Sequence, residues 1–296
     1  MIAARSSVTF DAIGTKWQIR LLQEITAQNK ASLFTKVTDR IELFDKAYSR
    51  FRSDSLVTKI SQSAGKYTFP DDALPLINLY QELYQLTDGI FTPLIGSVME
   101  SAGYDAQYSL QPSQMSSPPS WADVIQYSHP QLSMKRPHML DFGAGGKGYL
   151  VDLVAEVLVT NGVTSFYIDA SGDVLHQDET DLEITVGLEH PGNPREVIGV
   201  ARLSNQAICG SAGNRRTWDI YHHIINPKTL TSPQEILAVW VIANSTLLSD
   251  VLSTALFFVS PELLLSRYTF KYLLINQDYS ITKSDDFPAE LYTSGS

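Results

Sequence analysis

Glycines and a lysine are concentrated in residues 140–152, immediately before a helical pattern. Glycine leaves the backbone bare, so a ligand can approach it closely, and the first N–H groups of a helix attract anions. Lys147 adds a positive charge to this segment. The combination predicts a binding site for a phosphate-bearing ligand. The glycines concerned are Gly143, Gly145, Gly146 and Gly148.

The same segment also matches a dinucleotide-binding pattern, because Gly143, Gly145 and Gly148 have the G-x-G-x-x-G spacing. Asp169 follows an apolar run at about the distance of the ribose-binding acid in a Rossmann fold. However, residues 133–140 are charged and interrupted by proline, whereas the first Rossmann strand is a continuous apolar run. The pattern therefore favours a different phosphate site, and a Rossmann dehydrogenase that binds NAD is the alternative.

Asp250 and Thr254 lie four residues apart in a predicted helix, so they share one face. A carboxylate and a hydroxyl are hard oxygen donors of the kind that Mg²⁺ binds. In the alternative interpretation, Ser249 or Asp250 caps the helix and Thr254 bonds back to its own turn. The residues alone leave both interpretations open.

Two adjacent histidines, His222 and His223, precede a proline turn at a predicted strand end. Neighbouring strand residues point to opposite faces, so we expect one ring to act as a general base and the other to pack or stay exposed. Arginines occur in residues 211–216 and 48–53, where they either hold a phosphate or are solvated surface charges.

The composition is that of an ordinary globular protein of 296 residues, with 44% hydrophobic and 18% charged residues. This length suits one large domain or two intimately joined lobes. A net charge of −10 argues against a nucleic-acid partner. The single cysteine, Cys209, excludes an internal disulfide and is expected to be a small buried residue.

The N-terminus lacks an apolar signal core, and no run of about eighteen apolar residues follows. We therefore expect no membrane span and, for the chain as it stands, a cytoplasmic protein. A trimmed leader would make it extracytoplasmic instead.

Hydrophobic periodicity outlines the elements that must position these residues. Alternation predicts a hairpin with Gly14 at its turn, and spacings of three or four predict helices, the second with Asp71 and Asp72 as candidate caps. Residues 105–138 are rich in Ser, Pro and Gln and read as an irregular surface excursion. The hairpin pairs 8–13 with 16–21, the helices cover about 33–51, 76–86, 150–161 and 247–258, and the later strands are 163–168, 183–188, 197–203, 236–243 and a last one at 272–275.

Strands and helices in this mixed order favour an α+β fold over strict βα alternation. No internal repeat or compositional linker divides the chain. We therefore expect a single domain over residues 1–296.

Several of these motifs, taken in order, resemble the ApbE family of FAD:protein FMN transferases. The resemblance spans residues 8 to 276, and the motifs together are far more specific than any one of them. The matching segments are 13–15, 48–51, 88–93, 140–143, 147–149, Asp152, 171–173, 223–227, and Asp250 with Thr254.

The resemblance implies an α+β fold of two intimately joined lobes, with FAD held between them and Mg²⁺ on its pyrophosphate. In the family's reaction, a Thr or Ser hydroxyl of an acceptor protein attacks the FMN-side phosphorus. A phosphodiester joins FMN to the acceptor, and AMP is released. Some members instead hydrolyse FAD to FMN and AMP.

By position, the resemblance also implies roles for individual residues. Asp250 and Thr254 are implied as side-chain metal ligands, with the backbone carbonyl of Gly146 completing the set. Catalysis is assigned to Asp250 and to His223, which assists the attacking hydroxyl. The implied FAD-binding residues are Gly14, Thr15, Tyr48, Asp88, Gly143, Gly145, Lys147 and Asp173.

The chain departs from the family pattern at several positions. Thr92 and Asn226 stand where the family has aspartates, so a carboxylate that orients His223 would be missing at Asn226. Leu230 replaces a glycine and Ala212 a serine, whereas Ile13 for Met and Gly146 for Ala are benign. An FAD pyrophosphatase and a flavin-binding protein without catalysis are therefore the alternatives to an FMN transferase.

Overall fold

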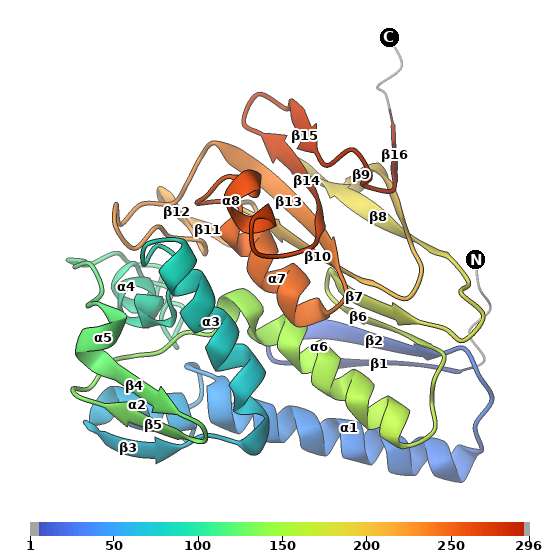
Figure 1. The fold of residues 1–296 in the computed structure, drawn as a ribbon, viewed down its shortest axis with the longest axis horizontal. Helices are drawn as coiled ribbons and strands as arrows, with labels where there is room; N and C mark the ends of the chain where they lie inside the picture. Colours follow the sequence, from blue (N-terminus) through green and yellow to red (C-terminus); the bar gives the residue numbers. More distant parts are fainter. Residues whose placement is uncertain (1–5, 293–296) are drawn as a thin grey trace.

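The larger of two lobes is built on an eight-stranded sheet in the computed structural model, which describes residues 6–292 (Figure 1). All neighbouring strands are antiparallel, so the sheet contains no βαβ unit and the Rossmann alternative is wrong. In spatial order the strands are β1 (Ser6–Ala12), β2 (Thr15–Leu21), β6 (Phe166–Ala170), β7 (Asp173–Gln177), β10 (Ala207–Ala212), β13 (Ile236–Ala243), β14 (Lys271–Asn276) and β15 (Ile281–Lys283).

Layers on both faces of this sheet explain why β13 is apolar throughout. Val239 and Val241 share a core with three helices, whereas Trp240 and Ile242 share a core with a second, three-stranded sheet. A strand covered on both faces buries every side chain. The helices are α1 (Ala27–Tyr48), α6 (Gly143–Thr160) and α7 (Thr246–Ala255), and the second sheet has the order β16 (Ala289–Leu291), β9 (Asn193–Leu203), β8 (Ile184–His190) (Figure 1).

The smaller lobe lies beside the C-terminal end of α1 (Figure 1). Leu132 and Leu76 from this lobe belong to the same hydrophobic core as Val151 of α6, so the lobes are joined by a continuous interior. Its sheet has the order β3 (Gly65–Thr68), β5 (Gln131–Met134), β4 (Ile125–Ser128), and its helices are α2 (Leu56–Gln62), α3 (Leu74–Leu86), α4 (Gly96–Ser101) and α5 (Trp121–Val124). The remaining short elements are η1 (Asp71–Ala73), η2 (Pro93–Ile95), β11 (Thr217–Trp218), β12 (Tyr221–His222) and α8 (Pro261–Leu265).

Most of the predicted elements are confirmed. The first two strands pair as a hairpin, and Ile13 and Gly14 at its turn both have positive φ, as a two-residue primed turn requires. Cys209 is a buried free thiol in β10. Within the described residues, no helix combines the length and apolar character needed to cross a bilayer.

Three structural predictions were wrong. Asp71 and Asp72 lie in η1 and do not cap α3, whose cap position is Ala73 without a side-chain hydrogen bond. The expected irregular excursion over 105–138 is confirmed for residues 105–120, but the rest contains α5, β4 and β5, because alternate residues such as Leu132 and Met134 reach the core. The strand at 272–275 is followed by β15 and β16.

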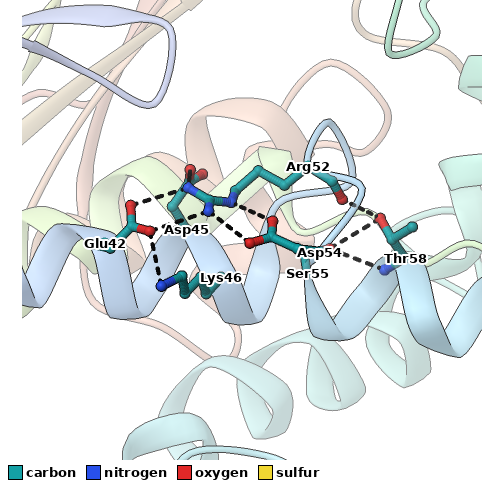
Figure 2. A network of polar contacts seen from close by, with 7 residues as sticks. All are labelled: Glu42, Asp45, Lys46, Arg52, Asp54, Ser55 and Thr58. Carbon is teal, nitrogen blue, oxygen red and sulfur yellow. Dashed lines mark hydrogen bonds and ion pairs between the residues drawn. The ribbon is translucent and has the colours of Figure 1, made fainter.

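The link between α1 and α2 is held by a network around Arg52 (Figure 2). Its guanidinium binds the carboxylates of Glu42, Asp45 and Asp54 at 3.0, 3.1 and 2.9 Å. Ser55 caps α2 by accepting a hydrogen bond from the backbone of Thr58. Arg52 is therefore a structural surface residue and not an anion clamp.

Candidate functional site

A cavity of about 470 Å³ lies where the two lobes meet. The hairpin turn, the first turn of α6, the end of β10, the segment after β12 and α7 all contribute to its wall. Of the sequence-predicted site residues, it brings together Gly14, Thr15, Gly143, Lys147, His223, Asp250 and Thr254.

The glycines of α6 serve helix packing as well as ligand access. A Cβ on Gly148 would lie 2.4 Å from the carbonyl oxygen of Thr246, and one on Gly145 would lie 2.3 Å from the side chain of Val251. Both positions therefore let α7 approach α6. Gly145 faces α7 and does not line the cavity, so its predicted role in ligand binding is replaced by a role in packing.

The first turn of α6 faces the cavity through Gly143, Ala144 and Lys147. Asp141 holds this turn in place: Oδ1 accepts a hydrogen bond from the backbone N–H of Gly143 at 2.6 Å. Its Oδ2 is bound at 2.6 Å by Nε of Arg50, which is buried. Arg50 is thus a structural partner of the loop, and the positive end of α6 is directed at the cavity.

Two buried carboxylates surround the ammonium group of Lys147. Its Nζ lies 2.8 Å from Oδ2 of Asp173 and donates to the carbonyl of Ala170 at 3.0 Å. Burial opposes the charge on Lys147, but Asp173 and Asp250 together raise its pKa above the usual range. Asp173 lies beneath the cavity wall and is not among the lining residues.

Asp250 carries the excess negative charge of this cluster. Its Oδ2 accepts a hydrogen bond from the backbone N–H of Gly148 at 2.8 Å. Burial, reinforced by the charge of Asp173, raises the pKa of Asp250 well above its ordinary value, against the attraction of Lys147. Burial likewise raises the pKa of Asp173. One lysine for two buried carboxylates leaves the cluster short of positive charge.

The capping interpretation of Asp250 is wrong. Ser245 caps α7 by accepting from the N–H of Leu248, and Asp152 accepts from the N–H groups of Thr246 and Leu247. Thr254 does not bond back to its own turn in the described hydrogen bonds. Its Oγ1 lies 3.3 Å from the hydroxyl of Ser211, so the Asp250 carboxylate and the Thr254 hydroxyl are both directed away from helix capping.

The two histidines diverge as predicted. His223 lines the cavity, whereas His222 lies on the other side, with its Nε2 2.8 Å from the carbonyl oxygen of Pro233. Burial and the nearby positive charge of Arg216 lower the pKa of His223 to about 3. The ring is therefore neutral at physiological pH, and with this pKa it is a weak base until a bound anion offsets the surrounding positive charge and raises its proton affinity.

Besides Gly145 and Asp173, three further predicted site residues do not line the cavity. Tyr48 is buried among aromatic rings, with Phe44 and Phe142 at 4.7 and 5.8 Å between centroids. The side chain of Asp88 is 98% exposed and pairs with Lys228 at 2.7 Å. Gly146 is buried within α6 and does not line the cavity.

The sequence interpretation missed an aromatic wall and a buried tyrosine. Tyr104 stacks on Trp218 at 5.7 Å, and its hydroxyl accepts a hydrogen bond from Arg216 of the 211–216 cluster. Tyr80 of α3 also lines the cavity, and burial, followed by the charges of Asp141 and Asp250, raises the pKa of its hydroxyl well above the usual value. In the sequence, Tyr80 falls at the helical spacing of the core residues around it, so no local pattern identifies it as a residue of the site.

The departures from the expected motifs have structural explanations. Oγ1 of Thr92 accepts from the N–H of Leu94 and caps η2. Oδ1 of Asn226 accepts from the N–H of Lys228 at 2.9 Å and so closes its own turn instead of orienting His223. Leu230 adopts a left-handed backbone with φ of 59°, which explains why glycine suits this position.

These features define a two-lobed α+β protein with a helix N-terminus, a lysine and a buried acidic pair at an interlobe cavity. The sequence profile of the ApbE family matches residues 13–269. The chain therefore belongs to the ApbE family.

Characterised relatives and solved structures agree with this assignment. The FAD:protein FMN transferase of Treponema pallidum (strain Nichols) is 23% identical over 280 residues, which cover 84% of this chain and 77% of the relative. That of Klebsiella pneumoniae (strain 342) is 25% identical over 254 residues, covering 78% and 77%.

Among solved structures, the ApbE protein of Thermotoga maritima superposes with a TM-score of 0.82 at 20% identity, covering 96% of this chain and 99% of that one. The flavin transferase ApbE of Vibrio cholerae gives 0.76 at 18% identity, with coverage of 94% and 96%. At these identities the structures establish the shared fold.

We expect Gly148→Ala to lower the free energy of unfolding by about 1–3 kcal/mol, because the added Cβ forces α7 away from α6. Gly146→Ala is the matched control. Its Cβ would come no closer than 3.6 Å to Phe44, and alanine stabilises a helix interior by about 0.5–1 kcal/mol relative to glycine. Urea unfolding measures both variants, and equal destabilisation would refute the packing role of Gly148.

Acidification should destabilise the protein partly through His223. Its folded pKa lies below the unfolded value of 6.5, so the unfolded chain binds the proton first and stability falls as the pH drops below about 6.5. The full pKa shift would give about 2 kcal/mol between pH 7 and 5, and the partial exposure of the ring makes this an upper limit. Thermal unfolding of His223→Gln should show a correspondingly weaker pH dependence over this range. Parallel curves for both proteins would contradict it.

Proposed function

We propose that this protein transfers FMN from FAD to a Thr or Ser hydroxyl of an acceptor protein, in the presence of Mg²⁺ and with release of AMP. The observation that carries the proposal is the convergence of Lys147, Asp250, Thr254 and His223 at one cavity in a chain of the ApbE family. Curated relatives that match most of the chain are named FAD:protein FMN transferase.

The phosphates of FAD fit the end of the cavity where α6 begins. The first turn of this helix presents backbone at Gly143 and Ala144, and Lys147 adds a positive charge. The remaining wall is apolar and aromatic, with Phe51, Ile90 and Tyr104 among its residues. Such a wall suits the rings of a flavin nucleotide.

A divalent cation fits the charges of the site. Asp173 and Asp250 are both buried, and burial raises the pKa of each carboxyl group, so a cation bound beside them would stabilise their charged forms. No group of three His, Cys, Asp or Glu side chains in residues 6–292 forms a metal site by itself. Mg²⁺ is bound by few protein oxygens together with phosphate and water, and we assign the side-chain oxygens of Asp250 and Thr254, both in the cavity wall, to this role.

His223 is the group that we assign to the proton of the acceptor hydroxyl. As the hydroxyl oxygen forms a bond to the FMN-side phosphorus, its proton passes to the neutral ring of His223, and the bond from that phosphorus to the bridging oxygen of AMP breaks. When bound, Mg²⁺ neutralises the charge that develops on the phosphate oxygens. Lys147 and the N-terminus of α6 hold the pyrophosphate in place.

The altered motif residues support a catalytic protein over a purely flavin-binding one. Thr92 and Asn226 are both engaged in local caps and turns, which a threonine or an asparagine performs as well as an aspartate. Among the described hydrogen bonds, neither Thr92 nor Asn226 contacts His223.

The test incubates the protein with FAD and Mg²⁺, with and without a domain that carries a flavinylation-type threonine, and follows AMP release and acceptor mass. We expect AMP release that depends on the acceptor, together with a mass gain of one FMN. AMP without acceptor would identify an FAD pyrophosphatase. Intact FAD under both conditions would identify a binding protein without catalysis.

Asp250→Ala should abolish AMP release. The variant lacks a ligand of the proposed Mg²⁺ ion, so the negative charge of the pyrophosphate is no longer neutralised. Asp286→Ala, which removes an exposed carboxylate outside the cavity, should leave the rate unchanged. Circular dichroism checks that both variants are folded. Unchanged AMP release by Asp250→Ala would refute the assignment of Asp250 as a metal ligand. The transferase activity would still be tested separately by the experiment with the acceptor.

A further inference from the structure

Tyr80 is a residue of the cavity wall, and its hydroxyl is buried. The residue is 1% exposed and belongs to the cavity wall. Within residues 6–292, its Oη has no partner with full hydrogen-bond geometry, although the backbone N–H groups of Ala144 and Gly145 at the start of α6 act on it and lower its pKa. A buried hydroxyl without a partner destabilises a folded protein by about 1–3 kcal/mol.

Packing alone does not account for this hydroxyl. The ring of Tyr80 lies against Phe91 and Phe142, with centroid distances of 5.1 and 5.2 Å. A phenylalanine would make the same ring contacts without burying a polar atom. The O–H proton has no acceptor among the described residues, and a ligand in the cavity would supply one.

The surroundings of Tyr80 indicate the chemistry of that partner. The ring lies beside the first turn of α6, since a Cβ on Gly145 would be 3.6 Å from it. This turn is the positive end of an eighteen-residue helix and faces the cavity together with Lys147. A protonated phenol beside such a terminus is a neutral hydrogen-bond donor suited to an anion.

We infer that the hydroxyl of Tyr80 donates a hydrogen bond to a phosphate oxygen of the ligand bound at the N-terminus of α6. The identity of that ligand as FAD rests on the proposed function. Lys147 is already paired with Asp173, so a donor without a carboxylate partner strengthens the hold on the phosphate at this end of the cavity. Tyr80 is thus a binding residue of this site.

The test measures the affinity of Tyr80→Phe for FAD and for inorganic pyrophosphate, each with Mg²⁺, by calorimetric titration. Loss of a hydrogen bond to a charged group should weaken binding of both by about 10- to 100-fold. The melting temperature of the free variant should be unchanged or higher, because the unpaired hydroxyl is gone. A role in the fold alone would not produce this combination.

Tyr149→Phe is the matched control, since Tyr149 is also a buried tyrosine but its hydroxyl donates to the carbonyl of Asp72 away from the cavity. This variant should lose stability and keep its affinity for FAD.

Equal affinities in the wild type and Tyr80→Phe would overturn the inference while leaving the proposed function intact. A wild type that binds pyrophosphate but not FAD would refute the proposed function, and the pyrophosphate comparison would still decide the role of Tyr80. A wild type that binds neither ligand would overturn both.

Discussion

The close contact between α6 and α7 is the constraint on which the site depends. Gly145 and Gly148 have no side chains, so the two helices lie close together. At this distance the carboxylate of Asp250 accepts a hydrogen bond from the backbone N–H of Gly148. That approach also brings Lys147, the residue preceding Gly148, into the field of Asp250. A bulkier residue at either glycine would separate the acid from the lysine and from the helix terminus. The glycine pattern is thus a packing requirement that has chemical consequences.

Charge is distributed within the site so that an acidic protein can hold an anion. The net charge of −10 is spread over the whole chain, whereas the start of α6 and Lys147 provide local positive potential. Directly beside them lie two buried carboxylates that lack sufficient countercharge. The cavity therefore places positive potential and buried carboxylates side by side, which is the arrangement behind our proposal of a metal-bound phosphate.

Much of the fold was predictable because the signals were local. The hairpin at Gly14, the apolar run of β13 and the face shared by Asp250 and Thr254 follow from periods of two and of 3.6 residues. Residues 105–138 were not predictable, because short strands such as β4 and β5 are stabilised by partners distant in sequence. Of the site, the glycine segment and His223 were recognisable, whereas Tyr80 was not. Its position in the wall depends on how α3 packs against α6, and the hydrophobic periodicity of the sequence does not predict the packing of two separate helices.

The pairing of β2 with β6 has a consequence for how the chain folds. Trp17 of the first hairpin lies opposite Ala170, so the hairpin finds its neighbour in the sheet only after more than half of the chain has been made. Contacts between residues so distant in sequence form slowly, because a long loop must close before they are made. During synthesis, the edge of β2 therefore stays unpaired until β6 has been made, and the cavity that Gly14 and Thr15 help to line cannot be completed before that point.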